Sequence, residues 1–397
     1  MTDTAIPGAL EQFRAAVRGD AALQAALQDC HDFGAFPALV LRLAQERGIA
    51  LDAADVANAL KPDPAGIARF MDPLSASPEL PPAGWLPIGI DAELAVDWLF
   101  FGARPLAEPF FEDSMRRARM LPYNRLIRYR TSLARLGEWA AHNPGLAPAG
   151  LIFHMSRCGS TLVAQMLAAV QTNVVVSEAA GIDAVVQFDR AGRADPQSCA
   201  TLLAQLTVAL GQKRNGHETR YFIKLDSWHT LALPLFRRAF PTVPWVFLYR
   251  DPVEVLASQL MQRGMQTVPH YLPPSHFGID SAENVSPEDY CALVLRRTCE
   301  AVIEHHAQGG GLLINYRDLP EAVAAQILPH FGVTPTPGER ATMTARTAFD
   351  AKTPMLSFSA EDDRRQKAAI AKAHSAGKLL DAVYGQLERL RTGAAAT

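Results

Sequence analysis

Residues 151–161, Leu-Ile-Phe-His-Met-Ser-Arg-Cys-Gly-Ser-Thr, decide the fold class of this chain. The first four residues form a short apolar run that is typical of a buried strand. After the run, Leu162, Val163, Met166 and Leu167 keep the spacing of a buried helix face. A turn between a strand and a helix presents backbone N–H groups at the positive end of the helix dipole, where phosphate or sulfate is stabilised. The stretch therefore predicts an anion-binding loop.

Four more apolar runs predict strands, at residues 174–176, 221–223, 245–249 and 312–315. Helical patterns separate them. Strands that alternate with helices indicate a parallel sheet with helices on both faces. We expect an α/β fold with three layers, similar to P-loop proteins, preceded by a small all-helical N-terminal domain.

The predicted loop spans Ser156, Arg157, Cys158, Gly159, Ser160 and Thr161. Glycine lets the backbone approach an anion closely, the two hydroxyls donate hydrogen bonds, and the guanidinium fork of Arg157 suits phosphate oxygens. The loop is not a Walker A motif, because no lysine follows Gly159. An ordinary strand-to-helix turn with a chance arginine is the alternative.

A second motif follows the apolar run at 245–249. It reads Arg250-Asp251-Pro252 and leads into a helical pattern whose second turn carries Ser258. From these positions Arg250 and Ser258 could both face one phosphate group. Together with the loop, this motif suits a ligand that carries two anionic groups.

In this order, the two motifs resemble those of sulfotransferases that use 3'-phosphoadenosine 5'-phosphosulfate (PAPS). Their form is closest to the protein-tyrosine and Golgi-type carbohydrate sulfotransferases, and the resemblance covers residues from about 147 to 390. It implies that the loop binds the 5'-phosphosulfate and that Arg250 and Ser258 bind the 3'-phosphate. It also implies PAPS as co-substrate, 3'-phosphoadenosine 5'-phosphate (PAP) as product, and no metal.

The resemblance also assigns catalytic roles. Glu178 follows the run at 174–176, where the resembling enzymes place a catalytic glutamate, so it is our candidate general base. Lys224 follows the run at 221–223 and is the candidate that stabilises the leaving group, with Arg157 assisting. A lysine on an apolar strand is costly unless its charge has a partner. The alternatives are a helix N-cap formed by Ser177 and Glu178, and a structural role for Lys224.

Other residues near these motifs receive lesser roles. Lys352 reaches the nucleotide if the chain follows its relatives. We interpret His154 and His229 as structural histidines. The long segment 264–286 is predicted to shape the acceptor pocket, because long loops in compact domains often form substrate walls.

Residues 1–62 predict short helices, with Gly48 ending the third and Asp52 capping the fourth. The segment resembles the nitrogen-fixation-associated leader domain in the run 10–13, in Asp20 and in the stretch 44–49. That resemblance implies a peptide or protein partner. A small helical bundle without an activity of its own is the alternative.

Residues 63–92 are rich in proline and predict a semi-rigid linker, and residues 93–146 predict a helical extension. A catalytic domain is expected over 147–397. The extension is locally basic, and we interpret its charges as a solvated helix face rather than an anion site. The basic residues are Arg116, Arg117, Arg119, Arg125, Arg128 and Arg130.

Composition excludes several classes of protein. The formal net charge of −3 provides no basic field for nucleic acid. The five cysteines form no CxxC pair, which favours a reducing compartment, and no apolar run of about 18 residues indicates a membrane span. We expect a cytoplasmic sulfotransferase that acts on a hydroxyl of a small molecule or a peptide. The alternatives are a P-loop-type kinase and an inactive peptide-binding scaffold.

Overall fold

The computed structural model describes residues 8–67, 71, 74, 76–77, 79–283, 285–349, 351 and 363–393. The chain divides into two compact units. The first comprises residues 1–104, 112–145 and 208–215, and the second comprises residues 105–111, 146–207 and 216–397. The domain boundaries predicted at residues 62, 92 and 146 stay predictions.

The first unit begins with four short helices, as predicted for this region. Asp20 caps the second helix by accepting hydrogen bonds from the backbone N–H groups of Ala22 and Leu23, and Asp52 caps the fourth through Ala54. Apolar residues one turn apart face inward. The helices are α1 (Ala9–Gly19), α2 (Ala21–Gln28), α3 (Phe36–Gln45) and α4 (Ala53–Ala59).

A three-stranded antiparallel sheet follows, and here the predicted helical extension is wrong. The strands are β1 (Trp85–Ile90), β2 (Ala95–Phe100) and β3 (Tyr129–Ser132), in the order β1-β2-β3. Every residue of the central strand β2 is buried except Asp97, which is half-buried. A strand covered on both faces is a continuous apolar run, and its spacing cannot be distinguished from that of a buried helix.

Strand β1 lies inside the predicted proline-rich linker, so the prediction of a linker is wrong for these residues. β1 is an edge strand, and its register shifts between Pro87 and Gly89. An edge position and a bulge are the places where a strand tolerates proline. The rest of the predicted extension does contain helices. They are α6 (Phe111–Arg119), α7 (Pro122–Leu126) and α8 (Ala134–His142).

The second unit contains a five-stranded parallel sheet, which confirms the predicted fold class. All five runs predicted as strands are strands, in the order β5-β6-β4-β7-β8. Each strand is parallel to its neighbours. The strands are β4 (Gly150–His154), β5 (Asn173–Ser177), β6 (Arg220–Lys224), β7 (Trp245–Tyr249) and β8 (Gly311–Asn315).

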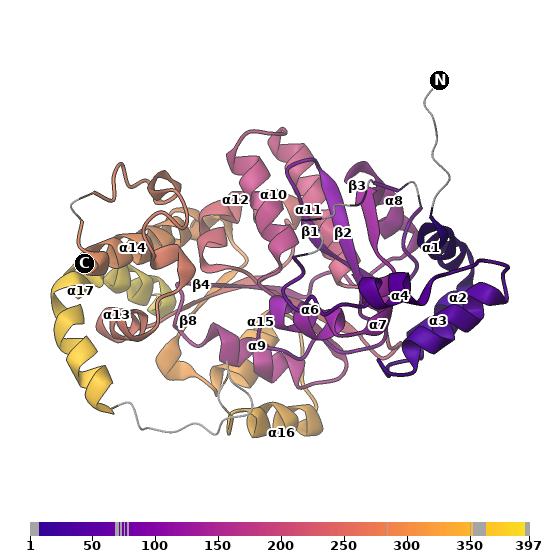
Figure 1. Ribbon diagram of the computed structural model, residues 1–397. Helices are drawn as coiled ribbons and strands as arrows, with labels where there is room; N and C mark the ends of the chain where they lie inside the picture. Colours follow the sequence, from indigo (N-terminus) through magenta and orange to yellow (C-terminus); the bar gives the residue numbers. More distant parts are fainter. Residues whose placement is uncertain are drawn as a thin grey trace. The chain divides into compact units, whose positions relative to one another are not determined.

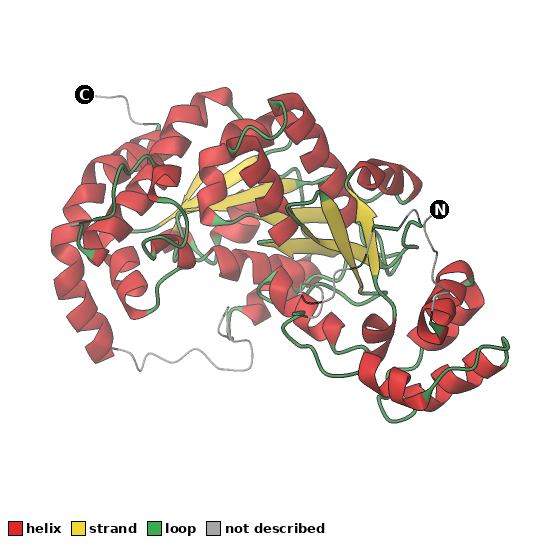
Figure 2. Ribbon diagram, turned by 45° about the horizontal axis from the view of Figure 1, so that its top comes forward, coloured by secondary structure: helices red, strands yellow, loops and turns green. Residues whose placement is uncertain are grey.

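Helices cover both faces of this sheet (Figures 1 and 2). Helix α9 (Ser160–Ala168) lies on one face, with α16 (Pro337–Arg346) packed against it. Helices α10 (Ala180–Arg190), α11 (Pro196–Leu210) and α12 (Leu233–Ala239) lie on the other. Right-handed crossovers require this arrangement, because the chain moves from β4 to β5 in one direction and from β5 through β6 to β7 in the opposite one.

Three further helices pack against one another in the second unit: α13 (Pro252–Met261), α14 (Pro287–His305) and α17 (Asp363–Thr392). Asp251 caps α13 and Ser286 caps α14. Short helical turns complete the unit. They are η1 (Ser227–Ala232), η2 (Met265–Thr267), η3 (Pro274–Phe277), η4 (His306–Gln308), η5 (Tyr316–Asp318), η6 (Val323–Ile327) and α15 (Leu328–His330).

Candidate functional site

The predicted site residues lie just past the carboxyl ends of four neighbouring strands. Glu178 follows β5, Lys224 ends β6, the loop 156–161 follows β4, and Arg250 follows β7. β4 and β7 are adjacent, but their connections leave in opposite directions and on opposite faces of the sheet. Such a topological switch point, at the carboxyl ends of parallel strands, is where open α/β sheets bind ligands.

The loop after β4 has an unusual backbone. Ser156, Arg157 and Gly159 have positive φ angles of 80°, 52° and 83°. Positive φ is costly for a non-glycine residue and gathers at functional sites. Glycine is needed at 159, because a Cβ there would lie 2.7 Å from Cδ1 of Leu319. No side chain among the described residues caps the start of α9 at Ser160.

The remaining loop side chains are mostly buried. The Oγ atom of Ser156 accepts a hydrogen bond of 3.1 Å from Nε2 of Gln259. Cys158 is fully buried, and burial raises the pKa of its thiol to about 12, so it is not a nucleophile. Ser160 and Thr161 are also buried.

Arg157 joins the loop to helix α13. Its Nε donates a 2.8 Å hydrogen bond to Oγ of Ser258, and one terminal nitrogen lies 3.3 Å from Oε1 of Gln262. Arg250 makes other contacts: its Nε donates to Glu254 at 2.7 Å, and its guanidinium lies 4.1 Å from the ring centre of Tyr316. The structure therefore brings Ser258 to Arg157, whereas the sequence suggested that Ser258 pairs with Arg250 around one phosphate.

Glu178 and Lys224 form a direct ion pair. Lys224 is 1% exposed, and its Nζ donates to Oε1 of Glu178, whose side chain is 23% exposed. The backbone of Glu178 has a φ of 56° and donates a 2.8 Å hydrogen bond to the carbonyl of Lys224. Because its N–H bonds across to β6, Glu178 does not form the helix N-cap that was the alternative, and the cap position of α10 is Ala179.

His154 adjoins this ion pair. Its Nδ1 accepts from the N–H of Ser156 at 3.0 Å, so the neutral ring carries its proton on Nε2, which lies 2.9 Å from the carbonyl of Leu225 and 3.5 Å from Glu178. Burial and the Lys224 charge lower the pKa of His154. Burial favours the neutral form of Glu178, but Lys224 and His154 outweigh it and lower the pKa of that carboxyl. Glu178 is ionised and, in this pairing, weakly basic.

A second buried cluster lies beside the first, and its central member, Asp183, belongs to no motif in the sequence. Its Oδ1 accepts from Nε1 of Trp228 at 2.6 Å and lies 3.0 Å from Nε2 of His229. Burial opposes ionisation of Asp183, but hydrogen bonds from His229 and Trp228 outweigh it and lower the pKa of Asp183 to about 2. Burial lowers the pKa of His229, but its hydrogen bond with Asp183 and the charge of Asp226 outweigh burial and raise that pKa. No sequence pattern marks Asp183, because it is a single aspartate on α10. Only its side-chain contacts in the folded protein identify it.

Asp226 lies between the two clusters. It is 7% exposed and lies 3.7 Å from Nε2 of His229, and burial together with the Glu178 charge raises the pKa of its carboxyl. Lys352 lies outside the described residues. In the part of the chain that the structure describes, no group of three or more His, Cys, Asp or Glu residues is arranged to hold a metal ion. No helix there is long and apolar enough to cross a membrane.

No family model and no curated protein match the chain. Solved structures similar to it include the sulfotransferase domain of the olefin synthase from Synechococcus PCC 7002, with 15% identity, 58% of this chain and 89% of that chain covered, and a TM-score of 0.34. Sulfotransferase STF9 from Mycobacterium avium has 11% identity, coverage of 60% and 80%, and a TM-score of 0.37.

Sulfotransferase STF1 from Mycobacterium tuberculosis H37Rv has 14% identity, coverage of 87% of this chain and 100% of that chain, and a TM-score of 0.34. With TM-scores this low, the likeness says nothing about residues or ligands. Any activity assigned to this chain therefore rests on its own residues.

Proposed function

We propose that the chain is a sulfotransferase that moves the sulfuryl group of PAPS to a hydroxyl of a small molecule or a peptide. The contact that carries the proposal is the hydrogen bond from Arg157 to Ser258. It joins the two segments that the sequence motifs assign to the two phosphate groups of one nucleotide. Residues 156–161 would bind the 5'-phosphosulfate, and Arg250 with Ser258 would bind the 3'-phosphate.

The backbone of the loop fits an anionic donor. Positive φ at Ser156 and Arg157 is a local cost, and its most direct benefit is to turn backbone N–H groups and the Arg157 side chain toward a phosphate. No lysine stands in the loop at the place where a triphosphate would need one. These features favour a phosphosulfate over a nucleoside triphosphate, and hence a sulfotransferase over a kinase.

The chemistry needs a base and a positive charge at the leaving group. The acceptor oxygen forms a bond to sulfur, the bond between sulfur and the 5'-phosphate oxygen breaks, and the acceptor proton goes to Glu178. Lys224 and Arg157 neutralise the phosphate that leaves. Fixed charges of this kind lower the barrier because they need no reorganisation during the reaction.

The ion pair between Glu178 and Lys224 has a consequence for this scheme. While Lys224 is bound to Glu178, the carboxylate is a weak base. A donor phosphate that draws the ammonium toward its bridging oxygen raises the pKa of Glu178 and makes it a better base. Binding of PAPS thus makes Glu178 a stronger base, because it draws the ammonium of Lys224 away from the carboxylate.

The first test is a calorimetric titration of the full chain with PAP in the absence of magnesium. We expect PAP to bind. We expect Arg250→Ala to lower the affinity for PAP by about tenfold or more, as for a lost charge-assisted hydrogen bond. The affinity for adenosine 5'-phosphosulfate, which lacks the 3'-phosphate, should stay nearly unchanged. Arg238→Ala, an exposed arginine of α12, is the matched control. Binding of ATP that requires magnesium, with no binding of PAP, would contradict the proposal and favour a kinase.

A further inference from the structure

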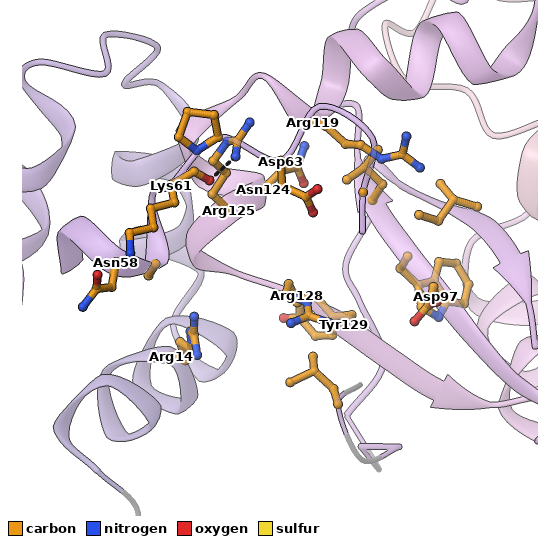
Figure 3. A pocket seen from close by; sticks show the side chains of 17 residues that line it. Arg14, Asn58, Lys61, Asp63, Asp97, Arg119, Asn124, Arg125, Arg128 and Tyr129 are labelled. Atoms are coloured by element: carbon orange, nitrogen blue, oxygen red, sulfur yellow. Dashed lines mark hydrogen bonds between the residues drawn. The ribbon is translucent and has the colours of Figure 1, made fainter. Parts of the chain in front are cut away.

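The first unit holds a cavity of about 410 Å³ (Figure 3). Its walls come from α1, from α4 and the residues after it, from the sheet and from α6 and α7. Ile88, Trp98 and Leu99 give it an apolar side. Pockets that take small molecules have volumes of about 300 to 1,000 Å³ and combine apolar walls with a few polar groups.

The polar part of the wall is mainly cationic. Glu11 pairs with Arg14, and Glu112 pairs with Arg119, so these two arginines are largely compensated. The wall also has two carboxylates, Asp63 and Asp97, and the charge of Asp63 acts on Arg125. Figure 3 shows the charged side chains arranged around the cavity. The five cations of the wall are Arg14, Lys61, Arg119, Arg125 and Arg128.

Arg125 is the most informative of these residues. It is only 8% exposed, and one terminal nitrogen donates to the backbone carbonyl of Lys61. Its Nε is buried and has no hydrogen-bond partner among the described residues. That Nε atom is enclosed by protein, so Arg125 contributes to the cavity wall through the charge of its guanidinium group.

Arg119 is held in the wall by a glycine. A Cβ on Gly66, whose φ is +69°, would lie 2.7 Å from Nε of Arg119, so a larger residue there would displace the guanidinium. Arg119, Arg125 and Arg130 are 6%, 8% and 6% exposed. The solvated helix face predicted for this basic stretch is therefore wrong for these residues. The short helix α7 and strand β3 interrupt the stretch, and Arg125 on α7 and Arg130 on β3 are buried.

We infer that this cavity binds a small organic anion, with a phosphate or a carboxylate against Lys61, Arg125 and Arg128 and an apolar body against the side that contains Trp98. The planar guanidinium fork matches both anions and can bind either with two hydrogen bonds. The volume of the cavity suits one small molecule. This site lies within the first unit and is independent of the proposed sulfuryl transfer.

Calorimetry with two probes tests the inference on the full chain. Phenyl phosphate and benzoate share an aromatic body and differ in the anion, so the tighter binder identifies the preferred group. We expect at least one to bind, and we expect Lys61→Gln and Arg128→Gln each to weaken it about fivefold to tenfold, as for one lost contact to a charge. Arg42→Gln, an exposed arginine of α3, is the matched control and should bind as the unmodified chain does.

Two of the variants separate binding in this cavity from misfolding and from binding at the loop of the second unit. Lys61 is exposed, so its substitution tests binding without a risk to folding. Arg157→Ala should leave phenyl phosphate binding unchanged, because that residue belongs to the loop of the second unit. The inference is overturned if neither probe binds with a dissociation constant below about 10 mM, which corresponds to a binding free energy of only about −3 kcal/mol. It is also overturned if Arg157→Ala removes the binding, or if Arg42→Gln weakens it as much as Lys61→Gln does.

Discussion

The side chains of Glu178 and Lys224 form an ion pair at the carboxyl ends of β5 and β6. The ammonium is almost fully buried, and Glu178 is the carboxylate bound to it. Removing one charge of a buried pair leaves the other uncompensated, whereas removing both together leaves a neutral contact. A catalytic role and a structural role of this pair therefore predict different results for single and double variants.

We expect Glu178→Gln and Lys224→Met each to lower sulfuryl transfer by at least about 100-fold, as for a lost general base or a lost charge at the leaving group, and we expect PAP affinity to change by no more than about threefold in Glu178→Gln. Release of PAP from PAPS across a panel of hydroxyl acceptors measures transfer, and calorimetry measures affinity. Transfer at the unmodified rate in either variant would remove the mechanism.

The double variant separates chemistry from folding. Because it removes both buried charges, its free energy of unfolding in urea should recover relative to Glu178→Gln, which leaves the ammonium of Lys224 unpaired. Its transfer rate should stay low. Recovery of stability without recovery of transfer is the result that a purely structural pair cannot produce.

At the scale of elements, one carboxylate of helix α17 accepts hydrogen bonds from residues of the sheet. Glu388 accepts hydrogen bonds from Nδ2 of Asn315 at 2.9 Å and from Arg317 at 2.7 Å, and it pairs with Arg391 one turn away. The hydroxyl of Tyr249, at the end of β7, donates to the same group. One side chain therefore ties α17 to β7, to β8 and to the turn that follows β8.

We expect Glu388→Ala to lower the free energy of unfolding by about 2 kcal/mol, because it removes several hydrogen bonds to a charged group and leaves the hydroxyl of Tyr249 without its acceptor. Urea denaturation followed by circular dichroism measures the change. Gln386→Ala, an exposed neighbour on the same helix, is the control and should change stability by no more than about 0.5 kcal/mol. Equal effects from the two substitutions would show that the network does not hold α17.

At the scale of the whole molecule, charge determines how the protein responds to acid. The chain has 41 acidic residues against 38 Lys and Arg and 11 His, so it is nearly neutral at pH 7 and strongly positive once the carboxyl groups are protonated. Self-repulsion then opposes the compact state. Carboxyl groups that are stabilised as anions in the folded protein add to this effect.

Asp183 is the carboxyl group that we choose to test how stability depends on pH. Its pKa is lowered from 3.8 to about 2 in the folded state, so its contribution to stability is complete above about pH 4 and is lost as pH falls through about 2. We expect Asp183→Asn to be less stable than the unmodified protein at pH 6, with a difference that shrinks as pH falls from about 5 to about 2. Urea denaturation at a series of pH values measures it. A difference that stays constant over this range would contradict the assignment.

Asp183 is also a site residue that the sequence did not reveal, whereas the loop around Gly159 was predicted. The loop is local, because a strand, a glycine turn and a helix follow one another within a few residues. Asp183 acquires its role from Trp228 and His229, which are 45 and 46 residues away. No periodicity in the sequence records such a contact.

The sequence alone determined the five parallel strands, the helix caps and the residues that follow each strand, because apolar runs, turn residues and caps act over a few neighbouring positions. The tertiary structure decided which of those residues meet. Arg157 bonds to Ser258 across 101 positions, and Lys224 bonds to Glu178 across 46. It also decided that β2 is a strand and that Arg119 and Arg125 are buried. The reason is physical: strand order and burial follow from packing between distant segments, and local propensity carries no record of it.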